Sequence, residues 1–174
     1  MGDPRPAVSL LATFDEEEAS VQAKKLNEIN EERKAIVEQI TQEALAMVNK
    51  ENHIHLLVNR GWHEGVLGIV AGKIMNETGK PTLVLTLKED GSAKGSGRSI
   101  EALNLFEMLD QMRDLFTYFG GHHAAVGLTM PSENVTILQE KMNQYIVDHQ
   151  IDLMRGPESV SYTHLRAHET LANL

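Results

Sequence analysis

Apolar residues recur at steps of three, four and seven between residues 15 and 50, which predicts one long α-helix. These positions are Ala19, Ala23, Leu26, Ile29, Ile36, Ile40, Ala44 and Met47. Asp15 is a suitable N-cap and Glu18 follows three residues later, as in a capping box. No Gly or Pro interrupts the segment, so the helix would be about 50 Å long at ~1.5 Å per residue. Because the apolar stripe is thin, the pattern favours a spine between two domains; the alternatives are an ordinary surface helix and half of a coiled coil.

The pattern after residue 52 is that of a small α/β domain. Apolar runs predict strands at 53–59 and 82–87, with a helix at 66–76 between them that Gly79 would end. Asp90-Gly91 is a hairpin signal. A return strand up to residues 95–99, a helix at 103–119, a strand at 128–130 and a last helix capped by Ser132 complete the order. We therefore expect an α/β fold, with a long N-terminal connecting helix followed by a small mixed sheet.

Composition and charge exclude some classes of protein but do not identify the function. The chain has 174 residues, no cysteine and a net charge of −9. The absence of cysteine excludes disulfides and favours a cytoplasmic location. No apolar run approaches the ~20 residues of a membrane span, so no membrane partner is expected. Residues 15–51 hold ten acids and five bases, whereas residues 53–130 hold eight and seven. The central region is therefore close to neutral, and a local nucleic-acid site remains compatible with it.

Two glycine-rich motifs carry the candidate chemistry. In Gly95-Ser96-Gly97-Arg98-Ser99 the glycines would expose backbone amides, the serines offer hydroxyls and Arg98 offers a planar fork suited to phosphate. The alternative is a glycine-rich strand end with a solvated arginine. The second motif, Gly120-Gly121-His122-His123-Ala124-Ala125-Val126-Gly127, predicts a helix-to-strand turn that could cradle phosphate. Its alternative is a tight structural turn with a capping histidine.

A third candidate is the loop Gly61-Trp62-His63-Glu64-Gly65, which precedes a helix rich in small residues. His63 and Glu64 could belong to a site or could be a pair that supports the loop. The three motifs together resemble the RecJ family of bacterial single-stranded-DNA-specific exonucleases, in its DHH-associated domain. The pattern Asn30-x-x-Arg33 on the long helix resembles the interdomain helix of that family. The resemblance covers roughly residues 1–150.

The resemblance implies a 5′-to-3′ exonuclease that acts on single-stranded DNA in repair and recombination. Such enzymes use Mn²⁺ or Mg²⁺ held by a DHH phosphoesterase domain. This sequence contains no Asp-His-His triplet, so no metal ligand and no catalytic residue is expected here, and an N-terminal DHH domain would be the partner. By resemblance, phosphate contacts fall to Ser96, Gly97, Arg98, Ser99, Gly120, Gly121 and His122, with His122 also a candidate support for catalysis and His63 and Glu64 as loop support. The chain alone is then expected to be inactive.

The same resemblance suggests a domain plan. Residues 1–14 would be the end of the DHH domain, 15–51 the interdomain helix and 52–150 the DHH-associated domain. Residues 151–174 are expected to be a disordered tail, in which 160–170 resembles a translated sequencing adapter. We therefore expect that His164 and His168, although four residues apart, do not form a metal site.

Three other functions remain open at this point. One is a related DHH-family phosphoesterase that acts on short RNA or nucleotide phosphates. Another is a non-enzymatic single-strand-binding module, although aromatic residues make up only 5% of the chain. The third is a metal hydrolase built from His63, Glu64, His122 and His123, which lacks a recognised ligand spacing.

Overall fold

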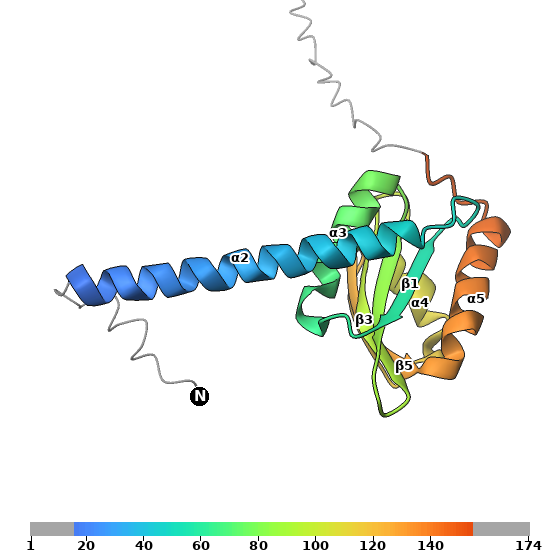
Figure 1. The fold of residues 1–174 in the computed structure, drawn as a ribbon. Coiled ribbons are helices and arrows are strands. Elements are labelled where there is room, and N and C mark those ends of the chain that lie inside the picture. The colour runs from blue at the N-terminus through green and yellow to red at the C-terminus, as the bar shows by residue number, and fades with distance from the viewer. Residues whose placement is uncertain (1–15, 155–174) are drawn as a thin grey trace, which may run out of the picture.

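The computed structural model describes residues 16–154. The long helix α2 spans Glu16–Ala46 and projects well beyond the rest of the domain (Figure 1). It is 31 residues long, and it ends four residues earlier than the sequence pattern predicts. The predicted cap Asp15, the expected end of a DHH domain at 1–14 and the tail segment at 160–170 lie outside the described residues.

The sheet has five strands in the order β1-β2-β3-β5-β4. β1 and β2 are parallel, and the other neighbouring pairs are antiparallel, which confirms the predicted mixed sheet. The strands span His55–Arg60 (β1), Thr82–Leu87 (β2), Ser92–Arg98 (β3), Tyr118–His122 (β4) and Ala125–Pro131 (β5). Gly91 sits at φ 82° in the β2–β3 turn, which explains the Asp-Gly signal there.

Short and medium helices connect the strands. α3 ends where predicted, because Gly79 adopts φ 70° and its amide donates to the Met75 carbonyl at 2.8 Å. Ser132 was expected to cap the last helix, but it begins a 3₁₀ turn, and α5 starts three residues later without a side-chain cap. These elements are η1 (Glu64–Val66), α3 (Leu67–Thr78), α4 (Leu105–Asp110), η2 (Arg113–Leu115), η3 (Ser132–Asn134) and α5 (Val135–Asp148).

The helix predicted at 103–119 is wrong in its second half. α4 ends at Asp110, and Tyr118–His122 form the edge strand β4 paired with β5. The prediction rested on apolar residues at a helical spacing up to Phe116, but the Phe116 side chain packs on an aromatic cluster: Phe119 stacks on Phe106 and Phe116, with ring centroids 5.0 and 5.3 Å apart. The three rings of this cluster therefore lie at sequence positions that resemble the apolar stripe of a helix. The Gly-Gly-His motif lies in a strand and is not a helix-to-strand turn.

Two hydrophobic cores cover the two faces of the sheet. On one face α3 packs on β2 and β3, and α2 packs on α3 through Val37, Ile40 and Ala44. On the other face α4 and α5 enclose the larger core (Figure 1). Val21, Leu26 and Ile29 in the first half of α2 are all more than half exposed. Only the C-terminal half of α2 therefore packs on the domain.

A hydrogen bond locks α2 onto the loop after β1. The Trp62 side chain is 5% exposed, and its Nε1 donates to Glu43 Oε2 on α2 at 2.7 Å. This bond, with a second from Gln39, lowers the pKa of the Glu43 carboxyl. Lys73 on α3 adds an ion pair with Glu38 on α2 at 3.2 Å. The long helix is thus held at a defined angle to the sheet.

Candidate nucleic-acid interface

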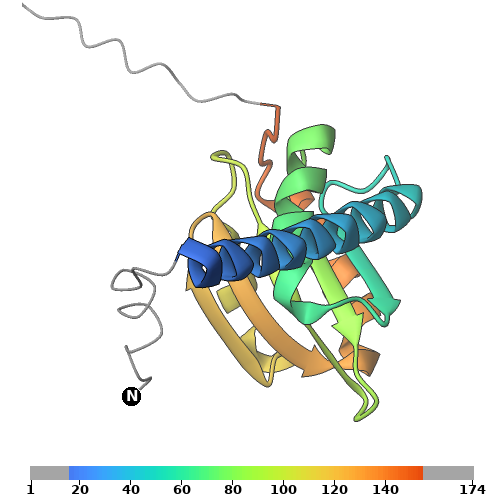
Figure 2. The same ribbon diagram turned by 60° about the vertical axis from the view of Figure 1, so that its left-hand side comes forward.

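Alternate residues of β3 point to opposite faces of the sheet. Gly97 faces the larger core, where a Cβ would meet Val126, Leu105 and Leu83. Lys94, Ser96 and Arg98 therefore share the opposite face, on the side of η1 and α3. α3 covers β2 and β3 on this side, while β5 and β4 extend beyond it (Figure 2). The result is a partly open sheet face bordered by α3.

Arg98 lies at the edge of this open face, packed against α3. A Cβ on Gly68 would sit 2.7 Å from Arg98 Nη2, and a Cβ on Gly72 would sit 3.9 Å from its Cγ. The small residues of α3 therefore make room for the arginine. Arg98 Nη1 donates to its neighbour's carbonyl, Gly97 O, at 2.8 Å. Among residues 16–154, the structure shows no ion pair to Arg98, so its charge is available to a ligand.

Glycines form the floor of the open face. Gly127 of β5 pairs with Ser96 on one side and with Gly120 on the other. A Cβ on Gly127 would meet no atom of residues 16–154 within 4 Å, so packing within this range does not require glycine there. In the described part of the chain, a Cβ on Gly120 would touch only Tyr118, at 3.4 Å from its hydroxyl oxygen. The missing side chains leave room for a ligand to approach the backbone.

The structure gives the residues around Arg98 different roles from those that the sequence motif predicts. β3 is paired on both sides, so the amides of Gly95 and Gly97 belong to the sheet ladders and are not exposed. These glycines are needed because a side chain would collide with β2 and with the core. Ser99 is 7% exposed, and its hydroxyl donates to the Leu103 carbonyl at 2.8 Å. Ser99 thus holds the loop after β3, while Ser96 stays partly exposed.

His122 ends β4 opposite Ala125, which also pairs with Arg98. The strand spacing places the Cα atoms of Arg98 and His122 roughly 10 Å apart. The His122 Nδ1 accepts from the Ala124 amide at 3.4 Å, and the side chain is exposed. Gly121 must be glycine for a structural reason, because its φ is 149° and a Cβ would collide with Ala125.

His63 and Glu64 lie at η1, at one border of the face. His63 Nδ1 accepts from the Gly65 amide at 3.1 Å, which caps η1. Glu64 pairs with Lys94 at 3.0 Å and with Lys88 at 3.5 Å. These two lysines hold the pKa of Glu64 below its usual range. The geometry is that of a loop support, next to a hollow of about 260 Å³ that Ser96 also lines.

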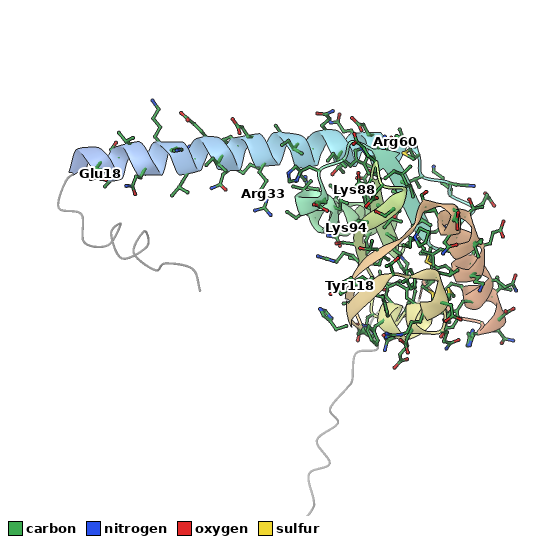
Figure 3. The ribbon with its side chains drawn as sticks, turned by 90° about the horizontal axis from the view of Figure 1, so that it is seen from below. Glu18, Arg33, Arg60, Lys88, Lys94 and Tyr118 are labelled. Carbon is green, nitrogen blue, oxygen red and sulfur yellow. The ribbon has the colours of Figure 1, made fainter. Side chains whose placement is uncertain are left out.

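Two features of the candidate site were not predicted from the sequence. Tyr118 is 65% exposed and lies beside the glycine floor, but its segment had the spacing of a helix. The alternation of Tyr118, Gly120 and His122 is the strand signal that could have revealed it. A groove of about 380 Å³ also runs between α2 and α3, lined by Asn27, Asn30, Arg33, Lys34, Val37, Ile69 and Lys73. In Figure 3, Arg33 points to the same side of the molecule as Lys94 and Tyr118.

Nothing in residues 16–154 forms a cluster of three or more His, Asp or Glu side chains that could hold a metal ion. The set His63, Glu64, His122 and His123 is divided between η1 and the β4–β5 turn. The donors for Mn²⁺ or Mg²⁺ are therefore not assembled in this part of the chain. In the same described range, no helix is long and apolar enough to cross a membrane.

The chain belongs to the DHHA1 domain family, whose model matches residues 44–148. Its curated relatives are single-stranded-DNA-specific exonucleases named RecJ. The protein of Bacillus subtilis is 36% identical over 170 residues, covering 90% of this chain and 22% of that protein. The protein of Escherichia coli is 30% identical over 159 residues, covering 85% and 28%. The expected resemblance to RecJ is thus confirmed.

Solved structures agree with this placement. RecJ from Thermus thermophilus in complex with Mg²⁺ has a TM-score of 0.71 at 27% identity, covering 82% of this chain and 22% of that one. A structure of exonuclease RecJ bound to manganese has a TM-score of 0.70 at 25% identity, covering 88% and 40%. The chain therefore spans well under half the length of the RecJ proteins it matches.

Proposed function

We propose that the open sheet face holds single-stranded DNA for a 5′-to-3′ exonuclease. The observation that carries this proposal is the position of Arg98 at the edge of the open face: it forms no ion pair with another described residue, and it pairs with Ala125, two positions from Gly127 of the glycine floor. Phosphate binding needs a positioned donor, and a close approach of the strand needs a surface without side chains. RecJ relatives named for single-stranded-DNA-specific exonuclease activity support the substrate class.

Each part of the face has a distinct task in this proposal. Arg98 binds a backbone phosphate through its fork, and the Ser96 hydroxyl binds the same or the next one. The floor at Gly127 admits the sugar and base, and the ring of Tyr118 offers a stacking surface for a base. His122, at the end of β4, donates to a phosphate at the far side of the floor. Arg33 in the α2–α3 groove extends the path toward the long helix.

The reaction itself needs groups that residues 16–154 do not assemble. Relatives solved with Mg²⁺ or Mn²⁺ indicate a metal-dependent nuclease. We assign metal binding to a DHH domain at the other end of α2 in the whole protein. The role of the DHHA1 domain is then to hold the strand in register, because phosphoryl transfer depends largely on positioning. This chain should bind single-stranded DNA without cleaving it.

The test is a binding titration with fluorescently labelled, 5′-phosphorylated single-stranded DNA at several salt concentrations. Arg98→Ala should weaken binding by roughly 10- to 100-fold, the cost of a charged hydrogen bond. It should also reduce the slope of log K against log salt by about 0.7, the value for one phosphate contact on a single strand. Arg60→Ala is the matched control, because Arg60 is an exposed arginine on the opposite face of the sheet.

Duplex DNA and short RNA serve as competitors in the same titration. Preference for short RNA or nucleotide phosphates would replace this proposal with a related DHH-family phosphoesterase. Cleavage by the chain alone, with Mn²⁺ added, would show that it carries a complete active site. Equal binding by the chain and by Arg98→Ala, with both shown to be folded by circular dichroism, would overturn the proposed role of the open face.

A further inference from the structure

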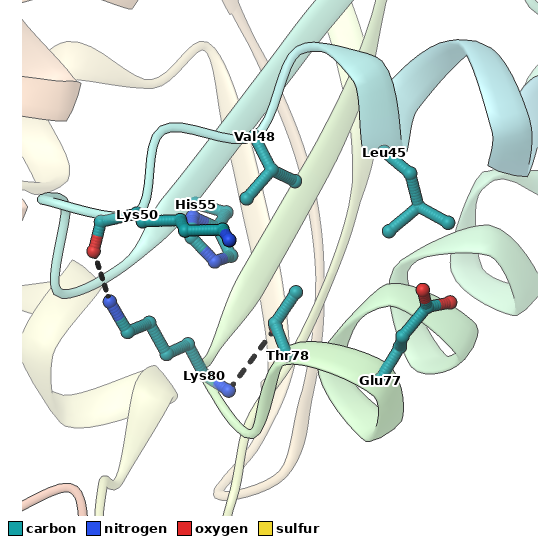
Figure 4. Close-up of a pocket in the computed structure, with 7 residues that line it drawn as sticks. All are labelled: Leu45, Val48, Lys50, His55, Glu77, Thr78 and Lys80. Atoms are coloured by element: carbon teal, nitrogen blue, oxygen red, sulfur yellow. Dashed lines mark hydrogen bonds between the residues drawn. The ribbon is translucent and has the colours of Figure 1, made fainter.

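A second pocket lies on the other side of α3, away from the open sheet face. It occupies about 540 Å³ between the end of α2, the start of β1 and the end of α3 (Figure 4). The lining residues are Leu45, Val48, Lys50, His55, Glu77, Thr78 and Lys80. Its volume is in the range of small-molecule sites, which commonly combine an apolar wall with a few polar groups.

His55 is the unusual residue of this pocket. Its side chain is 2% exposed, and neither ring nitrogen has a hydrogen-bond partner among residues 16–154. Burial and the nearby Lys80 ammonium lower the pKa of the imidazole, which favours the neutral ring. A neutral imidazole presents one donor and one acceptor, and leaving them unmatched in the interior is costly. The N–H can therefore still donate to an acceptor, and the other ring nitrogen can still accept from a donor.

The charges around His55 differ in their availability. Lys80 Nζ already donates to the carbonyls of Lys50 and Asn52, each at 2.7 Å, and so ties two loops together. The Thr78 hydroxyl donates to the Ile74 carbonyl at 2.8 Å. The exposed side chains of Lys50 and Glu77 form no ion pair with another described residue. Lys50 is thus the cation that a ligand can engage.

We propose that this pocket binds a small organic anion. Its anionic group pairs with Lys50, its planar part lies on the apolar wall of Leu45 and Val48, and a hydrogen-bonding group on that part reaches one ring nitrogen of His55. A nucleoside monophosphate has this chemistry, and its choice as ligand rests on the proposed function, because a nuclease releases such products. The Lys50 side chain turns aside to admit the ligand. The pocket is then a product-binding site separate from the DNA-holding face.

The test follows the ring nitrogens of His55 by two-dimensional NMR of the ¹⁵N-labelled chain during titration with 2′-deoxyadenosine 5′-monophosphate. The expected result is a saturable shift of both ring nitrogens. Lys50→Met, which keeps the length of the side chain, should weaken binding by roughly 10-fold or more. His55→Phe keeps an aromatic ring but removes both ring nitrogens, and it should weaken nucleotide binding by a similar factor. Binding to this variant is measured from the chemical shifts of neighbouring backbone amides. Lys24→Met is the matched control, because Lys24 is an exposed lysine far along α2.

The outcomes separate this proposal from the proposed function. Arg98→Ala should leave mononucleotide binding unchanged while it weakens DNA binding. If the wild-type chain binds single-stranded DNA but the His55 signals do not shift with the nucleotide, the pocket proposal is overturned and the proposed function stands. A response of equal affinity to inorganic phosphate or to deoxyadenosine alone overturns the assignment of a ligand that needs both parts. Retained binding in folded Lys50→Met overturns the role of Lys50.

Discussion

The Arg98 guanidinium lies against Gly68 of α3, so closely that a Cβ on Gly68 would be 2.7 Å from Nη2 and 3.3 Å from Cζ. The two residues are thirty positions apart, and the packing of α3 on β3 brings them together. Because Gly68 has no side chain, the arginine can lie along the helix with its fork at the border of the open face. The lack of a side chain at Gly68 thus determines how the Arg98 guanidinium is oriented.

Gly68→Ala should displace Arg98 and weaken binding of single-stranded DNA several-fold. The stability of the domain should stay constant or rise, because the clash is with the end of a flexible side chain and Ala gains about 1 kcal/mol over Gly in a helix. DNA titration and urea unfolding measure the two effects. Gly72→Ala is the control, since its Cβ would make an ordinary contact at 3.9 Å. The double variant with Arg98→Ala should bind no more weakly than Arg98→Ala alone.

Gly127→Val should fold normally and bind single-stranded DNA at least about tenfold more weakly. A Cβ there meets no described atom within 4 Å, and Val is favoured in strands, so the substitution should weaken ligand binding without a loss of stability. Gly121→Val is the contrasting variant and should lose roughly 1–3 kcal/mol of stability, because its φ of 149° disfavours side chains. Thermal unfolding and DNA titration distinguish the two. Unchanged DNA binding by Gly127→Val would contradict a ligand on the floor.

The bond between Trp62 and Glu43 should make stability depend on acid pH. The folded state lowers the pKa of Glu43, so this contribution is present above the usual glutamate pKa and is lost as the pH falls through the lowered value. Trp62→Phe removes the largest cause of the shift. The difference in unfolding free energy between the chain and Trp62→Phe should therefore shrink from about pH 6 to about pH 3. A constant difference across this range would show that the bond does not hold the carboxylate form.

His55 should produce a second pH dependence with its own window. Its folded-state pKa is lowered by burial and by Lys80, so the unfolded state binds the proton first. Stability is then full above the unfolded pKa of about 6.5 and falls as the pH drops toward the folded value. Lys50 and Glu77 also line this pocket, and their charges affect the pH at which stability falls. His55→Phe should remove this dependence and raise stability at pH 6; parallel pH profiles would contradict it.

Elements with strong local signals could be predicted from the sequence. The strand Thr82–Leu87, the Asp90-Gly91 turn and the stop of α3 at Gly79 lie where the pattern places them. The edge strand β4 was predicted wrongly as a helix end and a turn, because its two glycines have little strand propensity and leave only the weak alternation of Tyr118, Gly120 and His122 as a signal. Pairing with β5 and stacking of Phe119 on distant aromatic rings create it. The same reason explains why Tyr118 was missed as a candidate contact.

By itself, the sequence determined the local elements, the α/β class and the three glycine-bearing motifs that resemble the RecJ family. These depend on periodicity, turn chemistry and residue type, which are properties of neighbouring positions. Only the tertiary structure decided which glycines pack against the fold and which leave space, and that Ser99 is occupied while Arg98 is available. It also placed the unpartnered ring of His55 in a pocket. Such facts depend on contacts between residues far apart in the chain, which sheet pairing and helix packing create.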